Sequence, residues 1–158
     1  MYSEIVSKIK DFKQQDVLFL GMGNEALGDD AAGPYFISLL EENKNKHSFK
    51  YFDCGTVLES FFSKIKAQQP KLIVFVDAAD FGQSAGKVIN ADINNIENAS
   101  ASTHSLPLSV FAKFLINEMP AAPEFMFIAI QSANLEYGAP LNTEIEKNLK
   151  SLAEEIYK

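Results

Sequence analysis

The fold is decided by residues 71–77, KLIVFVD, in which five consecutive apolar side chains lie between a lysine and an aspartate. A short apolar run of this kind is typical of a strand that is covered on both faces, as strands of parallel sheets are. Residues 17–21 and 124–131 have the same character. We therefore expect these three segments to form the centre of a mainly parallel sheet.

Helical patterns alternate with the predicted strands along the chain. Two further strands are expected over residues 49–53 and 87–90, the second at an edge of the sheet, and helices over residues 5–12, 34–43, 58–69, 106–118 and 141–156. Thr56 followed by Glu59 has the form of a capping box that would open the third helix. This alternation predicts an α/β protein: a three-layer α/β/α sandwich around a twisted, mainly parallel sheet of about five strands, in one domain over residues 1–158.

Composition narrows the classes of partner. The 158 residues contain 14 lysines, no arginine and 21 acidic residues, which gives a net charge of −7. A nucleic-acid partner is therefore not expected, because phosphate binding needs a positive field. No apolar run approaches the roughly 20 residues of a membrane helix, and the N-terminus has no signal-peptide pattern. The lone Cys54 favours a reducing compartment, and we expect a soluble cytoplasmic protein.

The Gly-spaced loop over residues 21–33 follows the first strand and precedes a helix. A dinucleotide fingerprint would place Gly where Ala26 stands, although Ala is a tolerated variant, and a phosphate loop would place Lys where Asp29 stands. The adjacent carboxylates of Asp29 and Asp30 would compete with a phosphate for the positive end of the helix. Nucleotide binding is therefore disfavoured, and the two aspartates could either cap the helix or bind a cation.

Three residues are candidates for a metal or catalytic site: Asp30, Asp77 at the end of the central strand, and His104 in a polar loop before a helix. In a parallel α/β sheet the working crevice lies beyond the carboxyl ends of the strands, where Asp30 and Asp77 are expected. Together the three would supply two oxygen ligands and one nitrogen ligand, which suits Ni, Zn or Fe better than Ca or Mg. For Asp77 the alternative is an Asx turn into the following loop, with Asp80 more exposed.

Other reactive groups are better explained by structure. Cys54 has no nearby His in the sequence, and a buried structural thiol is the common fate of a single cysteine. His47 lies in a Lys- and Asn-rich stretch and is predicted to be on the surface. The chain contains no G-x-S-x-G elbow of a serine hydrolase.

Four motifs, in this order along the chain, resemble those of the [NiFe]-hydrogenase maturation endopeptidases: Gly21-x-Gly23-Asn24-x-x-x-x-Asp29-Asp30-x-x-Gly33, Asp53-Cys54-Gly55-Thr56, Val76-Asp77-Ala78-Ala79-Asp80-Phe81-Gly82 and Ser102-Thr103-His104-Ser105-Leu106-Pro107-Leu108. The resemblance extends over residues 17–131, and the last two motifs are most similar to the branch that serves formate-hydrogenlyase-type (hydrogenase 3) enzymes. Two departures are Asp30, where some members carry Glu, and Leu58, where a Pro often follows the second motif.

The resemblance implies a protease that removes a short C-terminal extension from the large-subunit precursor of a [NiFe]-hydrogenase after nickel has been inserted. It implies that Asp30, Asp77 and His104 bind nickel that belongs to the substrate, with Asp30 or Asp77 also placed as a general base. Whether such a peptidase is metal-dependent or aspartic in type is left open. The alternatives are a nickel-dependent checkpoint or chaperone that binds the precursor without cutting it, and a small-molecule-binding or nucleotide-binding α/β domain.

Overall fold

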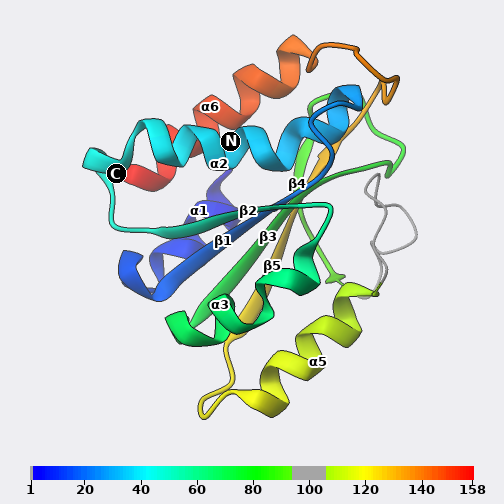
Figure 1. Ribbon diagram of the computed structural model, residues 1–158. Helices are drawn as coiled ribbons and strands as arrows, with labels where there is room; N and C mark the ends of the chain where they lie inside the picture. Colours follow the sequence, from blue (N-terminus) through cyan, green and yellow to red (C-terminus); the bar gives the residue numbers. More distant parts are fainter. Residues whose placement is uncertain (1, 94–105) are drawn as a thin grey trace.

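A five-stranded sheet forms the centre of the computed structural model, which describes residues 2–93 and 106–158 (Figure 1). The spatial order is β2-β1-β3-β5-β4. The four strands β1, β2, β3 and β5 run parallel, and β4 pairs antiparallel with β5 at one edge. The mainly parallel sheet predicted from the sequence is confirmed. The bounds of the strands are Val17–Met22 (β1), Lys50–Gly55 (β2), Leu72–Ala79 (β3), Val88–Ala91 (β4) and Glu124–Gln131 (β5).

Helices cover both faces of the sheet, as the predicted sandwich requires (Figure 1). One face is packed by α1, α2 and α6, and the other by α3 and α5. The bounds of the helices are Ser3–Lys10 (α1), Ala32–Glu42 (α2), Phe62–Gln68 (α3), Leu108–Glu118 (α5) and Thr143–Tyr157 (α6); short 3-10 turns lie at Gln14–Asp16 (η1), Gly28–Ala31 (η2), Lys44–Lys46 (η3) and Leu58–Phe61 (η4).

Strand alternation divides the core between the two faces. In β1, Val17 and Phe19 join the cluster under α2 and α6, whereas Leu18 and Leu20 join the cluster under α3 and α5. Every residue of β3 is buried. This explains why the central strand is continuously apolar, since neither of its faces meets water.

The order of the strands places a topological switch point between β1 and β3. From β1 the chain passes through α2 to β2 on one side, and then through α3 to β3 on the other side of β1. The two crossovers leave in opposite directions and on opposite faces, so the carboxyl ends of β1 and β3 are not closed over by one connection. Ligand sites of open α/β sheets form at such points.

The start of α2 lies directly on the backbone of β1 and β3. A Cβ atom added to Gly33 would be 2.2 Å from the Met22 carbonyl oxygen and 2.5 Å from that of Val76. A Cβ on Gly21 would be 2.7 Å from the Gly33 carbonyl oxygen. These contacts require glycine, and they fix the position of the η2 turn that precedes α2 above the ends of the two strands.

The predicted capping box at Thr56 and Glu59 is wrong. The chain turns tightly after β2, with the Val57 N–H donating to Cys54 O and the Ser60 N–H donating to Val57 O. This 3-10 geometry delays α3 until Phe62, where no side chain caps the helix. The last helix is capped instead by Asn142, whose side chain accepts a hydrogen bond from the Glu144 N–H at 2.8 Å.

Within residues 2–93 and 106–158, every helix is too short or too polar to cross a lipid bilayer.

The Gly33 contact predicts a large loss of stability on a small substitution. Gly33→Ala should lower the free energy of unfolding by about 3 kcal/mol, because the methyl group meets two backbone oxygens that cannot move independently of the sheet. Gly82→Ala is the control, since a Cβ there meets nothing within 4 Å. Its positive φ of 75° should cost only about 1 kcal/mol. Urea denaturation of both variants tests this, and equal losses would contradict the close approach.

Candidate functional site

The buried acidic and amide side chains of the described residues gather at one end of the molecule. They are Asp29, Asp30, Asp77 and Gln131, with exposed fractions between 0% and 4%. Asp29 and Asp30 follow β1, Asp77 lies near the carboxyl end of β3, and Gln131 ends β5. Burying a carboxylate is costly unless partners compensate for the lost water, so each of these groups needs a structural or functional explanation.

Asp30 lies in η2, between β1 and α2, and is 2% exposed. Its Oδ2 atom accepts a hydrogen bond from the Asn24 N–H at 2.7 Å. Gly23 makes this turn possible, because it has a φ of 140° and a Cβ there would lie 1.9 Å from the Asp30 carbonyl oxygen. The carboxylate is therefore held across the loop rather than on its own helix.

Asp77 lies inside β3, opposite Ala129 of β5, and is fully buried. The strand continues to Ala79, so the alternative of an Asx turn at Asp77 is wrong. That role belongs to Asp80, which is exposed and whose Oδ1 accepts from the Gly82 N–H at 3.2 Å. Asp77 therefore lies within a buried strand near its carboxyl end, and not in the turn that follows.

The structure brings two of the three predicted site residues to the same place. Val76, which precedes Asp77, pairs with Gly21 of β1, and η2 contacts β3. Asp30 and Asp77 therefore flank the switch point. His104 lies outside the described residues. Among those that are described, no three His, Cys, Asp or Glu side chains are grouped to hold a metal ion, and the predicted site residues that can be placed are the two carboxylates.

Asp29 has a different role from its neighbour. Its Oδ2 accepts from the N–H groups of Ala133 and Asn134 at 2.8 and 2.9 Å, and its Oδ1 accepts from that of Asn142 at 2.9 Å. Three charge-assisted bonds satisfy this buried carboxylate and join η2 to the β5–α6 loop, residues 132–142. The alternative that Asp29 and Asp30 cap α2 is wrong, because the N-cap residue is Ala31 and no side chain caps that helix.

Gln131 at the end of β5 was missed by sequence reasoning as a site-shaping residue. Its Oε1 accepts from the Phe81 and Gln83 N–H groups at 2.9 and 3.2 Å. Its Nε2 donates to Asp80 Oδ1 at 3.1 Å and to the Ser132 carbonyl at 2.8 Å. One amide thus fixes the loop that follows Asp77. The available signal was an amide residue ending an otherwise apolar strand.

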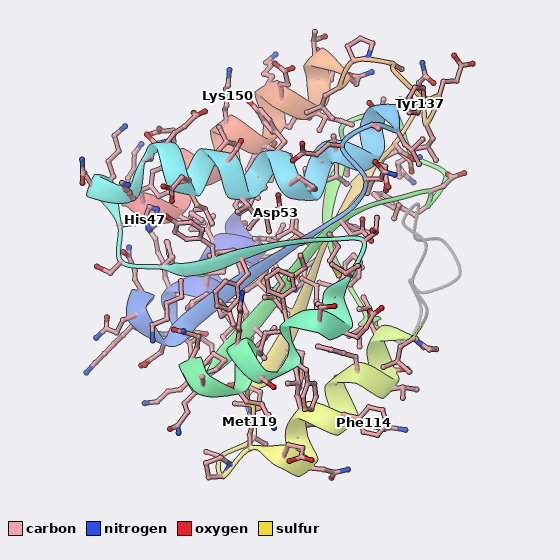
Figure 2. The ribbon with its side chains drawn as sticks, in the orientation of Figure 1. His47, Asp53, Phe114, Met119, Tyr137 and Lys150 are labelled. Atoms are coloured by element: carbon pink, nitrogen blue, oxygen red, sulfur yellow. The ribbon has the colours of Figure 1, made fainter. Side chains whose placement is uncertain are left out.

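A hollow of about 250 Å³ opens beside the Asp30 turn, lined by residues 23–25, Pro34, Asp53 and residues 55–56. Asp53 is exposed on β2 and accepts a hydrogen bond from the Gly55 N–H at 3.1 Å (Figure 2). The first and second sequence motifs therefore form the two walls of one surface depression.

Cys54 is a buried structural thiol, as predicted. It is 1% exposed, and burial raises its pKa to about 12, with a smaller contribution from the negative charge of Asp53. A thiol in this state is protonated at neutral pH and is neither a nucleophile nor a metal ligand.

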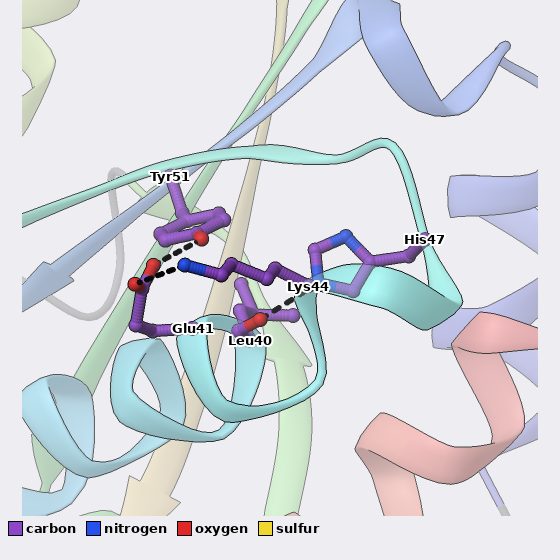
Figure 3. A network of polar contacts seen from close by, with 5 residues as sticks. All are labelled: Leu40, Glu41, Lys44, His47 and Tyr51. Carbon is purple, nitrogen blue, oxygen red and sulfur yellow. Dashed lines mark hydrogen bonds and ion pairs between the residues drawn. The ribbon is translucent and has the colours of Figure 1, made fainter.

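His47 is remote from the site, although it is not the surface residue that was predicted. It follows the C-terminal end of α2, whereas Asp30 precedes the N-terminal end. The half-buried ring hydrogen-bonds Leu40 O through Nε2 at 2.9 Å (Figure 3), accepts from the Phe49 N–H at 3.1 Å, and stacks on Tyr157 with a centroid distance of 5.1 Å. These contacts join the ring to the end of α2, to the residue before β2 and to α6, so His47 has a structural role.

Comparisons with known proteins agree with this arrangement of motifs. The model of the HycI hydrogenase maturation protease family matches residues 34–158. The hydrogenase 3 maturation protease of Escherichia coli K12 is 30% identical over 146 residues, which are 89% of this chain and 88% of that protein.

Solved structures give the same answer. The crystal structure of the maturation protease HycI from Thermococcus kodakarensis KOD1 has a TM-score of 0.81 and 29% identity, and the match covers 97% of this chain and 96% of that one. This chain belongs to the hydrogenase maturation protease family. The protein is a peptidase, and its likeness to the E. coli relative agrees with the hydrogenase 3 branch predicted from the sequence. The solution structure of E. coli HycI, at 24% identity and with a TM-score of 0.77 over 89% of this chain and 88% of that one, shares the fold.

Asp29 is expected to contribute to the stability of the protease. Asp29→Asn should lower the free energy of unfolding by about 3 kcal/mol, because an amide cannot accept all three bonds and places a donor against a backbone N–H. Thermal and urea unfolding measure the loss. If Asp29→Asn unfolds at the same urea concentration as the wild type, the three hydrogen bonds of Asp29 do not hold η2 and the β5–α6 loop together.

Gln131→Leu should raise the pKa of Asp80. The Gln131 amide is the main cause that lowers this pKa, and the Gly82 N–H adds to the effect. A folded-state pKa below the unfolded value gives stability that is present above the unfolded pKa and lost as the pH falls through the folded one. Gln131→Leu should therefore remove most of the pH dependence that Asp80 gives to the free energy of unfolding in the acid range.

Carbon-detected NMR titration of the Asp80 carboxyl measures the shift. Glu41 is the internal control, since its pKa is lowered by separate contacts with Tyr51 and Lys44 (Figure 3). An unchanged Asp80 titration in Gln131→Leu would show that the amide does not set this loop.

Proposed function

We propose that the protease removes the C-terminal extension of a [NiFe]-hydrogenase large-subunit precursor after nickel insertion, and that it recognises the nickel carried by the precursor. The observation that supports this most strongly is the pair of buried carboxylates, Asp30 and Asp77, at the switch point. The lone buried Cys54 supports a cytoplasmic setting for the reaction.

The donor types suit this substrate. Asp30 and Asp77 offer carboxylate oxygens, and His104 in the third motif offers an imidazole nitrogen. Such a mixed oxygen and nitrogen set, with positions left open, fits a nickel ion that already has ligands in the precursor. In this proposal the nickel is part of the substrate, and a precursor without it would lack the ion that completes the site.

The carboxylates also suit hydrolysis. Asp30 or Asp77 takes a proton from a water molecule, whose oxygen attacks the carbonyl carbon of the scissile bond. The C–N bond then breaks, and the proton passes to the leaving amine. Asp30 and Asp77 are favoured over Asp53 and Asp80 because they lie at the switch point, whereas Asp53 and Asp80 accept bonds from the turns that follow β2 and β3.

Three substitutions test the assignment: Asp30→Asn, Asp77→Asn and His104→Ala. Each should lower the rate of cleavage of nickel-loaded precursor at least about 100-fold, because each removes a group that is in contact with the reacting centre. Asp16→Asn is the matched control, since this aspartate lies at the amino end of β1 and forms an ion pair with Lys71 at 3.7 Å. Its rate should equal that of the wild type.

Mass spectrometry of the precursor's C-terminus identifies the product and distinguishes a protease from a checkpoint protein that binds without cutting. We expect one shortened chain plus the released extension, and no cleavage of nickel-free precursor. Full activity in all three variants would overturn the site assignment, and equal cleavage without nickel would overturn recognition of the metal.

A further inference from the structure

The β5–α6 loop, residues 132–142, exposes two large apolar side chains beside the site. Tyr137 is 84% exposed and Leu135 is 41% exposed. Figure 2 shows Tyr137 at the outer end of this loop, at the end of the sheet where the strands reach their carboxyl ends. Aromatic side chains are enriched at protein interfaces, so two large apolar side chains exposed on one loop beside the proposed site are suited to contact another molecule.

The loop is held rigidly against the Asp30 turn. In addition to the three bonds to Asp29, the Asp29 N–H donates to Asn134 O at 2.8 Å and the Gly138 N–H donates to Ala26 O at 2.8 Å. Gly28 makes the approach possible, because a Cβ there would lie 2.2 Å from the Asn134 carbonyl oxygen. A side chain presented by a fixed loop binds without paying to order that loop.

The charge around the loop defines the partner. Glu25 and Glu136 are exposed beside it, and neither residues 14–43 nor residues 114–146 contain a lysine or arginine. A partner surface that complements this end of the protease is an apolar socket with basic residues at its edge.

The surface around Tyr137 and the depression that contains Asp53 suit different kinds of ligand. An extended peptide needs a groove, and the hollow lined by residues 23–25, Pro34, Asp53 and residues 55–56 offers one. Tyr137 does not line that hollow and is exposed on the loop outside it. A projecting ring fits a socket on a folded surface.

We propose that Leu135 and Tyr137, flanked by Glu25 and Glu136, form a docking platform for the folded body of the large-subunit precursor, outside the extension that is cut. This inference rests on the proposed function. Docking here sets the position of the precursor relative to Asp30, because Asp29 joins the platform to the turn that carries Asp30.

Tyr137→Ser in the full-length protease tests the platform. The dissociation constant and the KM for nickel-loaded precursor should both rise about tenfold, with kcat unchanged, because the side chain touches the partner and not the reacting bond. Phe114→Ser is the matched control: Phe114 is 50% exposed on α5, on the opposite face of the sheet. Its dissociation constant should equal that of the wild type.

Competition identifies the occupant. The mature large subunit, which lacks the extension, should compete with the precursor, and the synthetic extension peptide should bind Tyr137→Ser as well as it binds the wild type. A peptide that loses affinity for Tyr137→Ser would overturn the inference in favour of tail binding. Equal precursor affinity in Tyr137→Ser and Phe114→Ser would also overturn it. So would a wild type that dimerises in solution together with a Tyr137→Ser variant that does not, because a second copy of the chain would then be the occupant.

Binding and cleavage are measured separately, so the two proposals fail separately. If the wild type binds the precursor but does not cut it, and Tyr137→Ser weakens binding, then docking stands and the proposed function fails. If cleavage depends on Asp30 and Asp77 but Tyr137→Ser does not change precursor binding, then the proposed function stands and the docking platform fails.

Discussion

The structure depends on the contact between the first turn of α2 and the backbones of β1 and β3. Gly33 lies against the carbonyls of Met22 and Val76, and Gly21 lies under the Gly33 carbonyl, at distances that no side chain would allow. This contact fixes the turn that carries Asp30 above the end of the strand that carries Asp77. Two carboxylates 47 positions apart in the sequence are thereby held at one switch point of the sheet.

Neighbouring acidic residues in this protease have separate tasks. Asp29 holds the β5–α6 loop through three backbone N–H groups, while Asp30 accepts a bond from Asn24 within its own loop. On the other strand Asp77 stays within β3, and Asp80 forms the turn that Gln131 fixes. In each pair one carboxylate stabilises a loop, and the other is the residue that we propose for the site.

The strands and the layered architecture could be predicted from local sequence patterns. The runs over residues 71–77 and 124–131 predicted strands because burial on both faces needs continuous apolar character, and the alternation with helices predicted the sandwich. The roles of Asp29 and Gln131 could not be predicted, since their partners come from distant segments. The capping box failed because the chain after β2 turns in 3-10 geometry over Leu58–Phe61, so that α3 begins at Phe62, beyond both residues of the box.

The site was predicted as three residues, of which the structure places Asp30 and Asp77 together, and His104 stays a prediction from the sequence. The central claim is that these carboxylates meet the nickel of the precursor. Nickel X-ray absorption, recorded on the precursor alone and on its mixture with the protease freeze-quenched before cleavage, tests this most directly. Added oxygen or nitrogen ligands in the complex, absent with Asp77→Asn, are the predicted result. An unchanged nickel spectrum in a mixture shown to be bound would contradict the account.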